Sequence, residues 1–367
     1  DGRVLPPGGS PALEKDEQPG VIDANDEIIF LLKDLAGPCP EEQLAAAKGD
    51  LTVLRASAAN LRAPAFAYLL LAEKSFLPSD TPVAYDASTD TVTTDGYFWG
   101  YDSKRPFHYS RMGYADLQGR SKEDLLDRLK VRMRVKALGS MVQLLFKEDE
   151  IESRLDGVRW GPVRVVREVW AQIKPVPGLA IPLTIRFAHY PRLWQASVKF
   201  RMPQMAALSV SSMDVALIHD FVDLRGIRLS TSGLSQGTVI DGKMIEQERS
   251  LDLGPQPWFM ISGLGLNQVT VVDLEPGLNL RATALFVEGG AEVADRPEEV
   301  PGGLPSVGYG FTGWENLKAR TYAFGANIAA LPGFPEGGGT GFYRTLRTPI
   351  DVQVTTREGA KSPGAAD

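Results

Sequence analysis

Apolar and cationic residues alternate without a break over residues 129–137, in the order Leu, Lys, Val, Arg, Met, Arg, Val, Lys, Ala. Alternation with a period of two residues is typical of a β-strand that buries one face, because successive side chains point to opposite sides of the sheet. An α-helix would distribute the same cations around its whole circumference. We therefore predict a strand over residues 129–137.

Further runs of β-branched, aromatic and aliphatic residues recur along the chain, most of them bounded by Gly, Pro, Asn or Asp. They cover residues 163–173, 183–188, 196–202, 213–221, 226–231, 268–272, 280–287, 319–328 and 350–356. Because no long helical pattern separates these runs, antiparallel sheets are expected rather than a doubly wound parallel sheet. The predicted fold class is all-β: a large antiparallel β-sandwich of the supersandwich type with a few short helices.

The Pro, Gly and polar residues between these runs predict the connections between the strands. Short helices are expected after Pro40, where Pro can occupy the first turn, and at Ser121–Asp124, which resembles a capping box. The Gly- and Pro-rich stretches 289–310 and 331–341 are predicted to be surface loops. The 37 Gly and 26 Pro of the whole chain agree with many turns between short elements.

The domain organisation follows from length and local composition. With 367 residues the chain can build one large β architecture or two packed domains. Residues 1–27 are predicted to form an extended N-terminal arm and residues 358–367 a disordered tail, because both offer little apolar surface to bury. Residues 28–357 are then the β-sandwich region, in which two halves could divide near residues 157–175.

The charge balance limits the expected partners. The chain has 39 Lys and Arg against 46 Asp and Glu, a net charge of −7, so neither nucleic acid nor anionic lipid should attract it over long range. Its most apolar runs, such as Ile28–Leu32, are far shorter than the ~20 residues of a membrane-spanning helix, so no transmembrane segment is expected. The chain starts at Asp1 without an initiator Met, and we favour an exported protein of the periplasm or the extracellular space.

Residues 14–27 end in the run Gly-Val-Ile-Asp-Ala-Asn-Asp-Glu. This stretch resembles the calcium-binding loops of dockerin and EF-hand proteins, which close with Gly-x-Ile-Asp-x-x-Asp-Glu, and the resemblance implies Asp23 and Asp26 as later calcium ligands. Lys15 stands at the first ligand position and Pro19 at the fifth, where oxygen ligands are expected. These departures favour a degenerate loop without its ion. Calcium is the alternative, and no other cofactor is expected.

The run Asp-Ala-Asn-Asp-Glu-Ile-Ile-Phe at residues 23–30, followed by Lys-Asp-Leu at residues 33–35, carries a second resemblance. It is similar to the opening of large exported bacterial β-rich proteins of uncharacterised function, and the similarity extends to about Arg167. The resemblance implies export and β-richness, and it transfers no catalytic residue.

Four cations share one face of the predicted strand at a spacing of ~6–7 Å, because alternate residues are two strand rises apart. They are Lys130, Arg132, Arg134 and Lys136. Such a row could bind a polyanion or the acidic face of a partner protein. The alternative, which we favour, is a solvated row that pairs across strands with nearby acids. Those acids are Glu148, Asp149, Glu150 and Glu152.

Large rings gather beside glycines in two short stretches, residues 96–101 and 308–316. The candidate binding residues there are Tyr97, Trp99, Tyr101, Phe311 and Trp314. Rings in such turns suit stacking on a sugar or insertion into a groove of a partner protein. The alternative, which we favour, is that they fill the core at the ends of the sheets.

The three histidines form no metal motif, since none belongs to a His-x-x-x-His pattern and no Cys cluster accompanies them. His108 and His189 have aromatic neighbours and could each act as a base at a carbohydrate site, although a structural role is the more common one. The Gly-rich and Ser-rich stretches match neither a phosphate-binding loop nor a nucleophile elbow.

Together these patterns favour a non-catalytic exported accessory or scaffold subunit that binds other protein subunits, with a membrane-embedded complex as one such partner. The alternative is a carbohydrate-binding or carbohydrate-active β-sandwich protein that uses His108 or His189 with acids and the aromatic turns. The sequence does not decide whether the protein is an enzyme, and the missing motifs favour one that is not.

Overall fold

The computed structural model divides into two compact units. It describes residues 51–58, 64–70, 82–176, 179–222, 224, 226–234, 237–239, 249–275, 277–287, 306–348 and 350–357. The small unit contains residues 51–70 and 344–357 of this set, and the large unit contains residues 82–343. The predicted N-terminal arm and C-terminal tail lie outside the described residues.

The small unit contains a three-stranded antiparallel sheet with β1 (Leu51–Ala58) at its centre. Its neighbours are β2 (Ala65–Leu70) and β22 (Ile350–Arg357). Leu51 lies opposite Leu70 on one side and opposite Arg357 on the other, so this sheet joins segments from the two ends of the described chain. The predicted strand at residues 350–356 is confirmed as β22.

The large unit contains three sheets of nine, six and four strands. In spatial order, the nine-stranded sheet consists of β15 (Thr238–Val239), β14 (Arg228–Thr231), β17 (Trp258–Gly263), β18 (Leu266–Asp273), β21 (Thr321–Leu331), β12 (Leu193–Arg201), β11 (Leu179–His189), β10 (Val165–Val176) and β9 (Glu152–Trp160). The six-stranded sheet consists of β16 (Arg249–Asp252), β19 (Arg281–Val287), β20 (Ser306–Glu315), β13 (Val210–Phe221), β7 (Leu126–Ala137) and β8 (Val142–Lys147). The four-stranded sheet consists of β3 (Val83–Asp86), β4 (Thr91–Thr94), β5 (Tyr97–Asp102) and β6 (Arg105–Tyr114).

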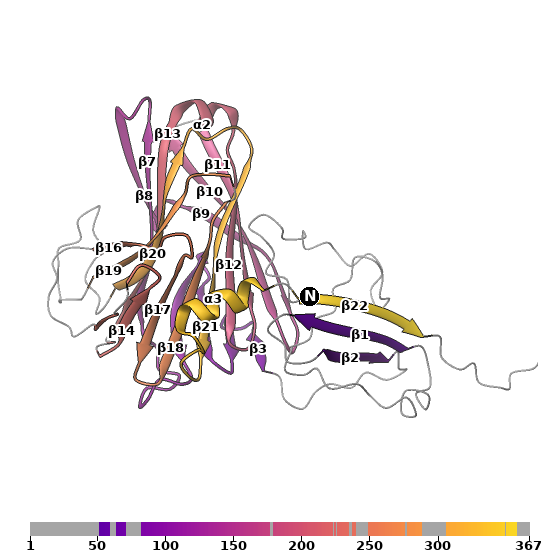
Figure 1. Cartoon of the computed structure of the whole chain (residues 1–367). Helices are drawn as coiled ribbons and strands as arrows, with labels where there is room; N and C mark the ends of the chain where they lie inside the picture. Colours follow the sequence, from indigo (N-terminus) through magenta and orange to yellow (C-terminus); the bar gives the residue numbers. More distant parts are fainter. Residues whose placement is uncertain are drawn as a thin grey trace, which may run out of the picture. The chain divides into compact units, whose positions relative to one another are not determined.

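Large rings fill the space between these sheets, whose long strands make up most of the large unit (Figure 1). Phe311 of β20 and Phe324 of β21 bring the six-stranded and nine-stranded sheets together, with ring centroids 4.8 Å apart. Trp99 of β5 and Trp194 of β12 do the same for the four-stranded and nine-stranded sheets at 4.6 Å. Each large apolar side chain buried in this way contributes about 2 kcal/mol relative to its exposed state. All four rings belong to one core, so the large unit is a single sandwich.

The all-β fold class is confirmed, and so are the strands predicted from the apolar runs. β7 buries Leu129, Met133 and Val135 on one face, as the alternation over residues 129–137 predicts. Near residues 157–175, where two halves could divide, β9 and β10 are hydrogen-bonded neighbours in one sheet.

The prediction of a loop over residues 289–310 was wrong for residues 306–310. Residues 306–310 start β20, a strand with a hydrogen-bonded neighbour on each side, β13 and β19. In this part of the range, Gly308 and Gly310 are sites of close approach between strands. A side chain at Gly308 would collide with the carbonyl oxygen of Leu217 and the Cα atom of Ile218.

Two further expectations about connections also changed. Residues 338–341 of the predicted loop 331–341 begin the helix α3 (Gly338–Arg347), where Gly339 leaves room for the ring of Trp258. Ser121–Asp124 forms turns rather than a helix, and the Ser121 hydroxyl donates a hydrogen bond to the Ala115 carbonyl at 2.7 Å.

The other helical segments in the described ranges are α2 (Gln204–Ser209) and the 3-10 turn η2 (Glu148–Glu150). No helix among these residues has the length and apolar character needed to cross a bilayer. α2 interrupts the path from β12 to β13 and buries Ala206, which ties the helix to the core.

Replacement of Gly308 by Ala should lower the free energy of unfolding by about 2 kcal/mol, because the added methyl group overpacks a strand contact. Its Cβ would lie 2.6 Å from the Cα atom of Ile218. Urea unfolding of the full chain measures the effect. Gly157→Ala in β9 is the matched control, since no atom lies within 4 Å of the added Cβ, and it should change stability by less than about 0.5 kcal/mol. Equal losses for the two variants would contradict the close approach at Gly308.

Candidate functional site

The five aromatic residues proposed for binding are all buried. They are Tyr97, Trp99, Tyr101, Phe311 and Trp314. The rings of the first three lie where β5 meets the other two sheets, and those of the last two lie between β20 and the nine-stranded sheet. In this structure they therefore fill the core, as the favoured alternative has it, and present no ring at the surface to a sugar or a protein groove.

His189 of β11 lies among these rings and is bonded to tyrosines at both ring nitrogens. Its Nε2 is 2.6 Å from the Tyr101 hydroxyl, and its Nδ1 is 3.3 Å from the Tyr97 hydroxyl. The Tyr97 hydroxyl also lies 3.0 Å from the carbonyl oxygen of Tyr190, which can only accept, so the tyrosine proton points there. The Tyr97 oxygen then accepts from Nδ1–H, and Nε2 accepts from Tyr101. This arrangement fits a neutral imidazole.

A buried arginine continues this network toward the surface. Arg167 of β10 lies with its guanidinium carbon 3.6 Å from the centroid of the Tyr101 ring. Its Nη1 donates to the Pro106 carbonyl oxygen at 2.8 Å, and its Nη2 donates to Asp90 at 2.5 Å. The carboxylate also accepts from the Tyr85 hydroxyl at 3.0 Å. The charge of a fully buried cation is thus neutralised by hydrogen bonds and by the aromatic face.

A second buried histidine, His219 of β13, pairs with Tyr109 through its Nε2 and stacks on the tyrosine ring. Burial lowers the pKa of His219 to about 4 and that of His189 to about 3. Both imidazoles are therefore neutral at neutral pH. Their partners and their depth make them parts of the core, so His189 does not form the surface base of a carbohydrate site.

The cationic row on β7 is divided by its surroundings. Lys130 is buried and forms an ion pair with Asp220 of β13, which also accepts from the Ser306 hydroxyl. Ile218 and Leu285, both buried, belong to a small apolar cluster on the same sheet. Burial raises the pKa of Asp220 to about 6 although Lys130 opposes the shift. Lys130 is therefore committed to an internal ion pair.

The other three cations of the row are only half-buried: Arg132, Arg134 and Lys136. Arg134 lies opposite Asp214 in the register of β7 and β13. Burial raises the pKa of that carboxyl group, and the nearby cations act in the opposite direction. The row thus borders an acid of its own sheet, and binding of a polyanion stays a prediction.

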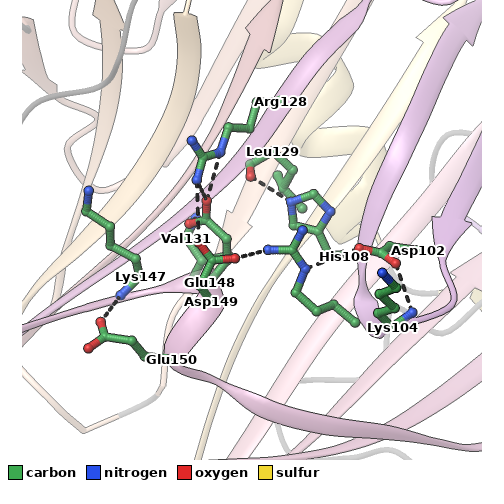
Figure 2. Close-up of polar contacts among 11 residues, drawn as sticks. Asp102, Lys104, His108, Arg128, Leu129, Val131, Lys147, Glu148, Asp149 and Glu150 are labelled. Atoms are coloured by element: carbon green, nitrogen blue, oxygen red, sulfur yellow. Dashed lines mark hydrogen bonds and ion pairs between the residues drawn. The ribbon is translucent and has the colours of Figure 1, made fainter. Parts of the chain in front are cut away.

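Three of the acids that the sequence offered as partners for this row pair with cations outside it, and Figure 2 shows two of the three, Glu148 and Asp149. The third, Glu152, pairs with Lys174. Glu148 is buried and accepts from Arg128 at 2.6 Å and from the backbone N–H of Val131 at 3.1 Å. The side chain of Glu150 accepts from the backbone N–H of Lys147 at 2.9 Å, which closes the turn η2. This cluster lies where β7 and the end of β8 meet the β5–β6 hairpin.

His108 of β6 lies beside this charged cluster, and Figure 2 shows its ring directed toward β7. Its Nε2 is 2.8 Å from the Leu129 carbonyl oxygen, so Nε2 carries the proton and Nδ1 carries the lone pair. Nδ1 is buried and has no hydrogen-bond partner among the described residues. Arg105, which pairs with Asp102 at 3.2 Å and with Asp149, adds to burial in lowering the pKa of His108. The imidazole is a buried acceptor whose role as a carbohydrate-site base stays a prediction.

An exposed apolar surface at one end of the large unit was not predicted. We call it the apolar end, and it consists of Leu138, Met141, Val142, Met205 and Leu208. The first three residues come from the β7–β8 hairpin and the other two from α2 (Figure 1). Met141, Met205 and Leu208 are 82%, 67% and 78% exposed, far more than single apolar residues in a core-facing strand or helix.

Backbone contacts hold the two parts of the apolar end together. The N–H of Leu138 donates to the Ser209 carbonyl oxygen at 2.8 Å, and the N–H of Ser140 donates to the Ser211 hydroxyl at 3.2 Å. Leu138 has a φ of 52°, in the left-handed region that glycine or asparagine usually occupies. The sequence signal was the apolar pair Leu138 and Met141 in a hairpin turn, where polar residues are the rule.

Asp23 and Asp26, the residues of the calcium-type loop, lie outside the described residues, so calcium binding stays a prediction. Within the described ranges, no three His, Cys, Asp or Glu side chains come together as metal ligands.

Comparison with known proteins gives similarity of fold at low sequence identity. No family model and no curated protein sequence matches the chain. An α-mannosidase from Enterococcus faecalis is 9% identical with a TM-score of 0.48, over 90% of this chain and 43% of that chain. An aldose epimerase homologue from C. elegans is 8% identical with a TM-score of 0.43, over 65% of this chain and 96% of that chain.

An α-N-acetylgalactosaminidase from Bifidobacterium bifidum is 10% identical with a TM-score of 0.36, over 70% of this chain and 36% of that chain. The chain thus spans less than half the length of either glycosidase. Similarities at this level assign neither a ligand nor an activity.

The two buried histidines should make the protein sensitive to acid. Below about pH 6.5 both histidines become protonated in the unfolded chain, whereas His189 and His219 stay neutral in the folded protein. The free energy of unfolding therefore decreases as the pH is lowered, by up to about 1.4 kcal/mol per pH unit for each histidine. Asp220 acts in the opposite sense between about pH 6 and its unfolded pKa of 3.8, because it binds its proton more tightly when folded.

His189→Gln tests this linkage, since the amide can still donate to one tyrosine and accept from the other. The slope of unfolding free energy against pH, measured with urea between pH 6 and pH 4, should be smaller than in the wild type by about 1.4 kcal/mol per pH unit. Parallel curves for the two proteins would show that His189 is protonated in the folded state.

Loss of the buried cation should cost more than loss of an exposed one. Lys130→Met leaves Asp220 buried without its partner, and should lower the free energy of unfolding by about 3 kcal/mol or more at pH 7.5. The loss should shrink at pH 5, where Asp220 can be protonated. Lys136→Met, on the same strand and face, is the control and should cost less than about 0.5 kcal/mol. Similar losses for both lysines, measured by urea unfolding, would refute the buried pair.

Proposed function

We propose that the protein is a non-catalytic accessory protein that docks through its apolar end onto a membrane-located assembly. The observation that carries this proposal is the exposure of Met141, Met205 and Leu208 on two elements that are hydrogen-bonded to each other. Contiguous exposed apolar side chains are rare on protein surfaces, and where they occur they commonly mark a site of interaction with a protein or a membrane.

The conformation of the hairpin supports a role for its apolar residues. Leu138 is more than half exposed, so no burial of its side chain compensates for its left-handed backbone. A glycine or asparagine would adopt the same backbone at lower cost. A functional contact made by the leucine side chain accounts for its presence there.

The state of the residues suited to proton transfer also supports a binding role. His189 and His219 are fully buried, neutral and hydrogen-bonded to tyrosines, and Arg167 is enclosed by Asp90 and Tyr101. Such groups stabilise a unique packing of the core. They take no part in chemistry at the surface.

The carbohydrate alternative loses the aromatic side chains on which it was based, because those rings are buried. Trp160 at the end of β9 is an exposed ring, 61% accessible and 5.3 Å from the ring of Tyr85. If this alternative holds, sugar should bind at that pair rather than at residues 96–101.

A photo-crosslinking amino acid placed at Met141 of the full chain tests the docking role in the cells that produce the protein. We expect light-dependent products larger than the chain itself, because an exposed apolar side chain in a docking surface lies against its partner. Leu264 is the matched control position, a partly exposed leucine with the same φ of 52° in the β17–β18 turn. Equal products from both positions, or none from Met141, would contradict the proposal.

A further inference from the structure

The apolar end has the shape and charge of a surface that inserts into a bilayer. Resting on the docking role proposed above, we propose that its direct partner is the headgroup and upper acyl region of an anionic lipid membrane. Leu138, Met141 and Leu208 would enter the apolar layer, and neighbouring cations would contact lipid phosphates.

α2 presents its apolar residues to one side only. Met205 and Leu208 are three positions apart and therefore share a face of the helix, which is exposed. Ala206 faces the core and is buried. A short helix with one face fixed to the protein and the other face apolar and exposed is suited to lie in the plane of a membrane interface.

The β7–β8 hairpin adds a protruding apolar tip to this helix. Met141 is the most exposed large apolar residue of the described chain, and Leu138 stands beside it across the turn. The backbone N–H groups of Leu138 and Ser140 already donate to α2 and β13, so insertion of the tip would leave neither unsatisfied. A tip of this kind fits a fluid layer, which needs no complementary groove.

Cations surround the apolar end more densely than acids do. Arg201 lies three residues before the start of α2, and the Arg320 carbonyl oxygen accepts from the N–H of Met202 at 2.9 Å, which brings the β20–β21 turn to the helix. The strand register and the contacts of the β20–β21 turn place five cations near this end, Arg134, Lys136, Arg201, Lys318 and Arg320, against three acids, Asp214, Glu275 and Glu315. Arg320 pairs with Glu275 at 2.9 Å.

This end is therefore positive in a chain whose net charge is −7. The net charge alone argued against attraction to anionic lipid, but membrane binding depends on the charges within a Debye length of the surface, about 8 Å at physiological salt. The remaining negative charge of the chain would orient this end toward the membrane and the rest of the molecule away from it.

The other occupants fit these observations less well. A second copy of the chain would bring two positive ends together around protruding tips, which repel and bury little area. A protein partner would need an apolar groove shaped to both the hairpin and α2. An anionic lipid surface can bury the exposed apolar side chains and can also pair its phosphates with the neighbouring cations.

Flotation of the purified full chain with lipid vesicles tests the proposal. We expect binding to vesicles of an equal mixture of phosphatidylcholine and phosphatidylglycerol, weaker binding to phosphatidylcholine alone, and release as NaCl is raised. Met141→Gln with Leu208→Gln should weaken binding by about tenfold or more. Arg201→Glu with Lys318→Glu should reduce the preference for the anionic vesicles.

Leu264→Gln is the matched control and should leave vesicle binding within about twofold of wild type. Its turn adjoins Leu331, at the other end of β21 from the Thr321 that pairs with Arg201. Circular dichroism melting should show that all variants fold. Absence of binding by the folded wild type, or equal binding by the Met141 and Leu208 variant, would overturn the proposal.

The crosslinking experiment separates failure of this proposal from failure of the docking role. Protein adducts from Met141 without vesicle binding would overturn the lipid contact and leave docking in place. Neither adducts nor vesicle binding would overturn both.

Discussion

The hydrogen bonds that His189 makes with Tyr97 and Tyr101 determine how the sheets of the large unit meet. The histidine belongs to the nine-stranded sheet and the tyrosines to the four-stranded sheet. A buried polar group left without a partner costs about 1–3 kcal/mol, so these bonds favour the arrangement of the two sheets in which both are made. Apolar packing alone would tolerate sliding, whereas these bonds allow one arrangement.

The apolar end obeys a different constraint because it lies beyond this core. The backbone N–H groups of Leu138 and Ser140 are paired, but Met141 and Leu208 have no covering layer in the described structure. The core therefore supplies rigidity, and the hairpin and α2 supply a surface. The same strand, β7, serves both parts, with Leu129 in the core and Ala137 next to the exposed turn.

The all-β class and ten strands followed from local patterns, because the alternation and apolar runs reflect burial directly. The start of β20 was not predicted because glycines such as Gly308 are typical of loops. The reason for glycine at this position is the close approach of the neighbouring strand, which the sequence does not show. For the aromatic turns, composition could not separate a surface platform from a core filler. The apolar end was missed because exposure depends on whether another element covers a turn, which is a property of the tertiary structure.

The position of β7 has a mechanical consequence. From Lys130 to Ala137 the strand runs ~23 Å at ~3.3 Å per residue, with hydrogen-bonded neighbours on both sides over most of that length. In an antiparallel ladder these bonds lie perpendicular to the strand, so tension applied at the tip along the strand axis loads them in shear and many must yield at once. An anchor on this hairpin would resist a steady pull far better than one on a terminal strand that can be peeled away bond by bond.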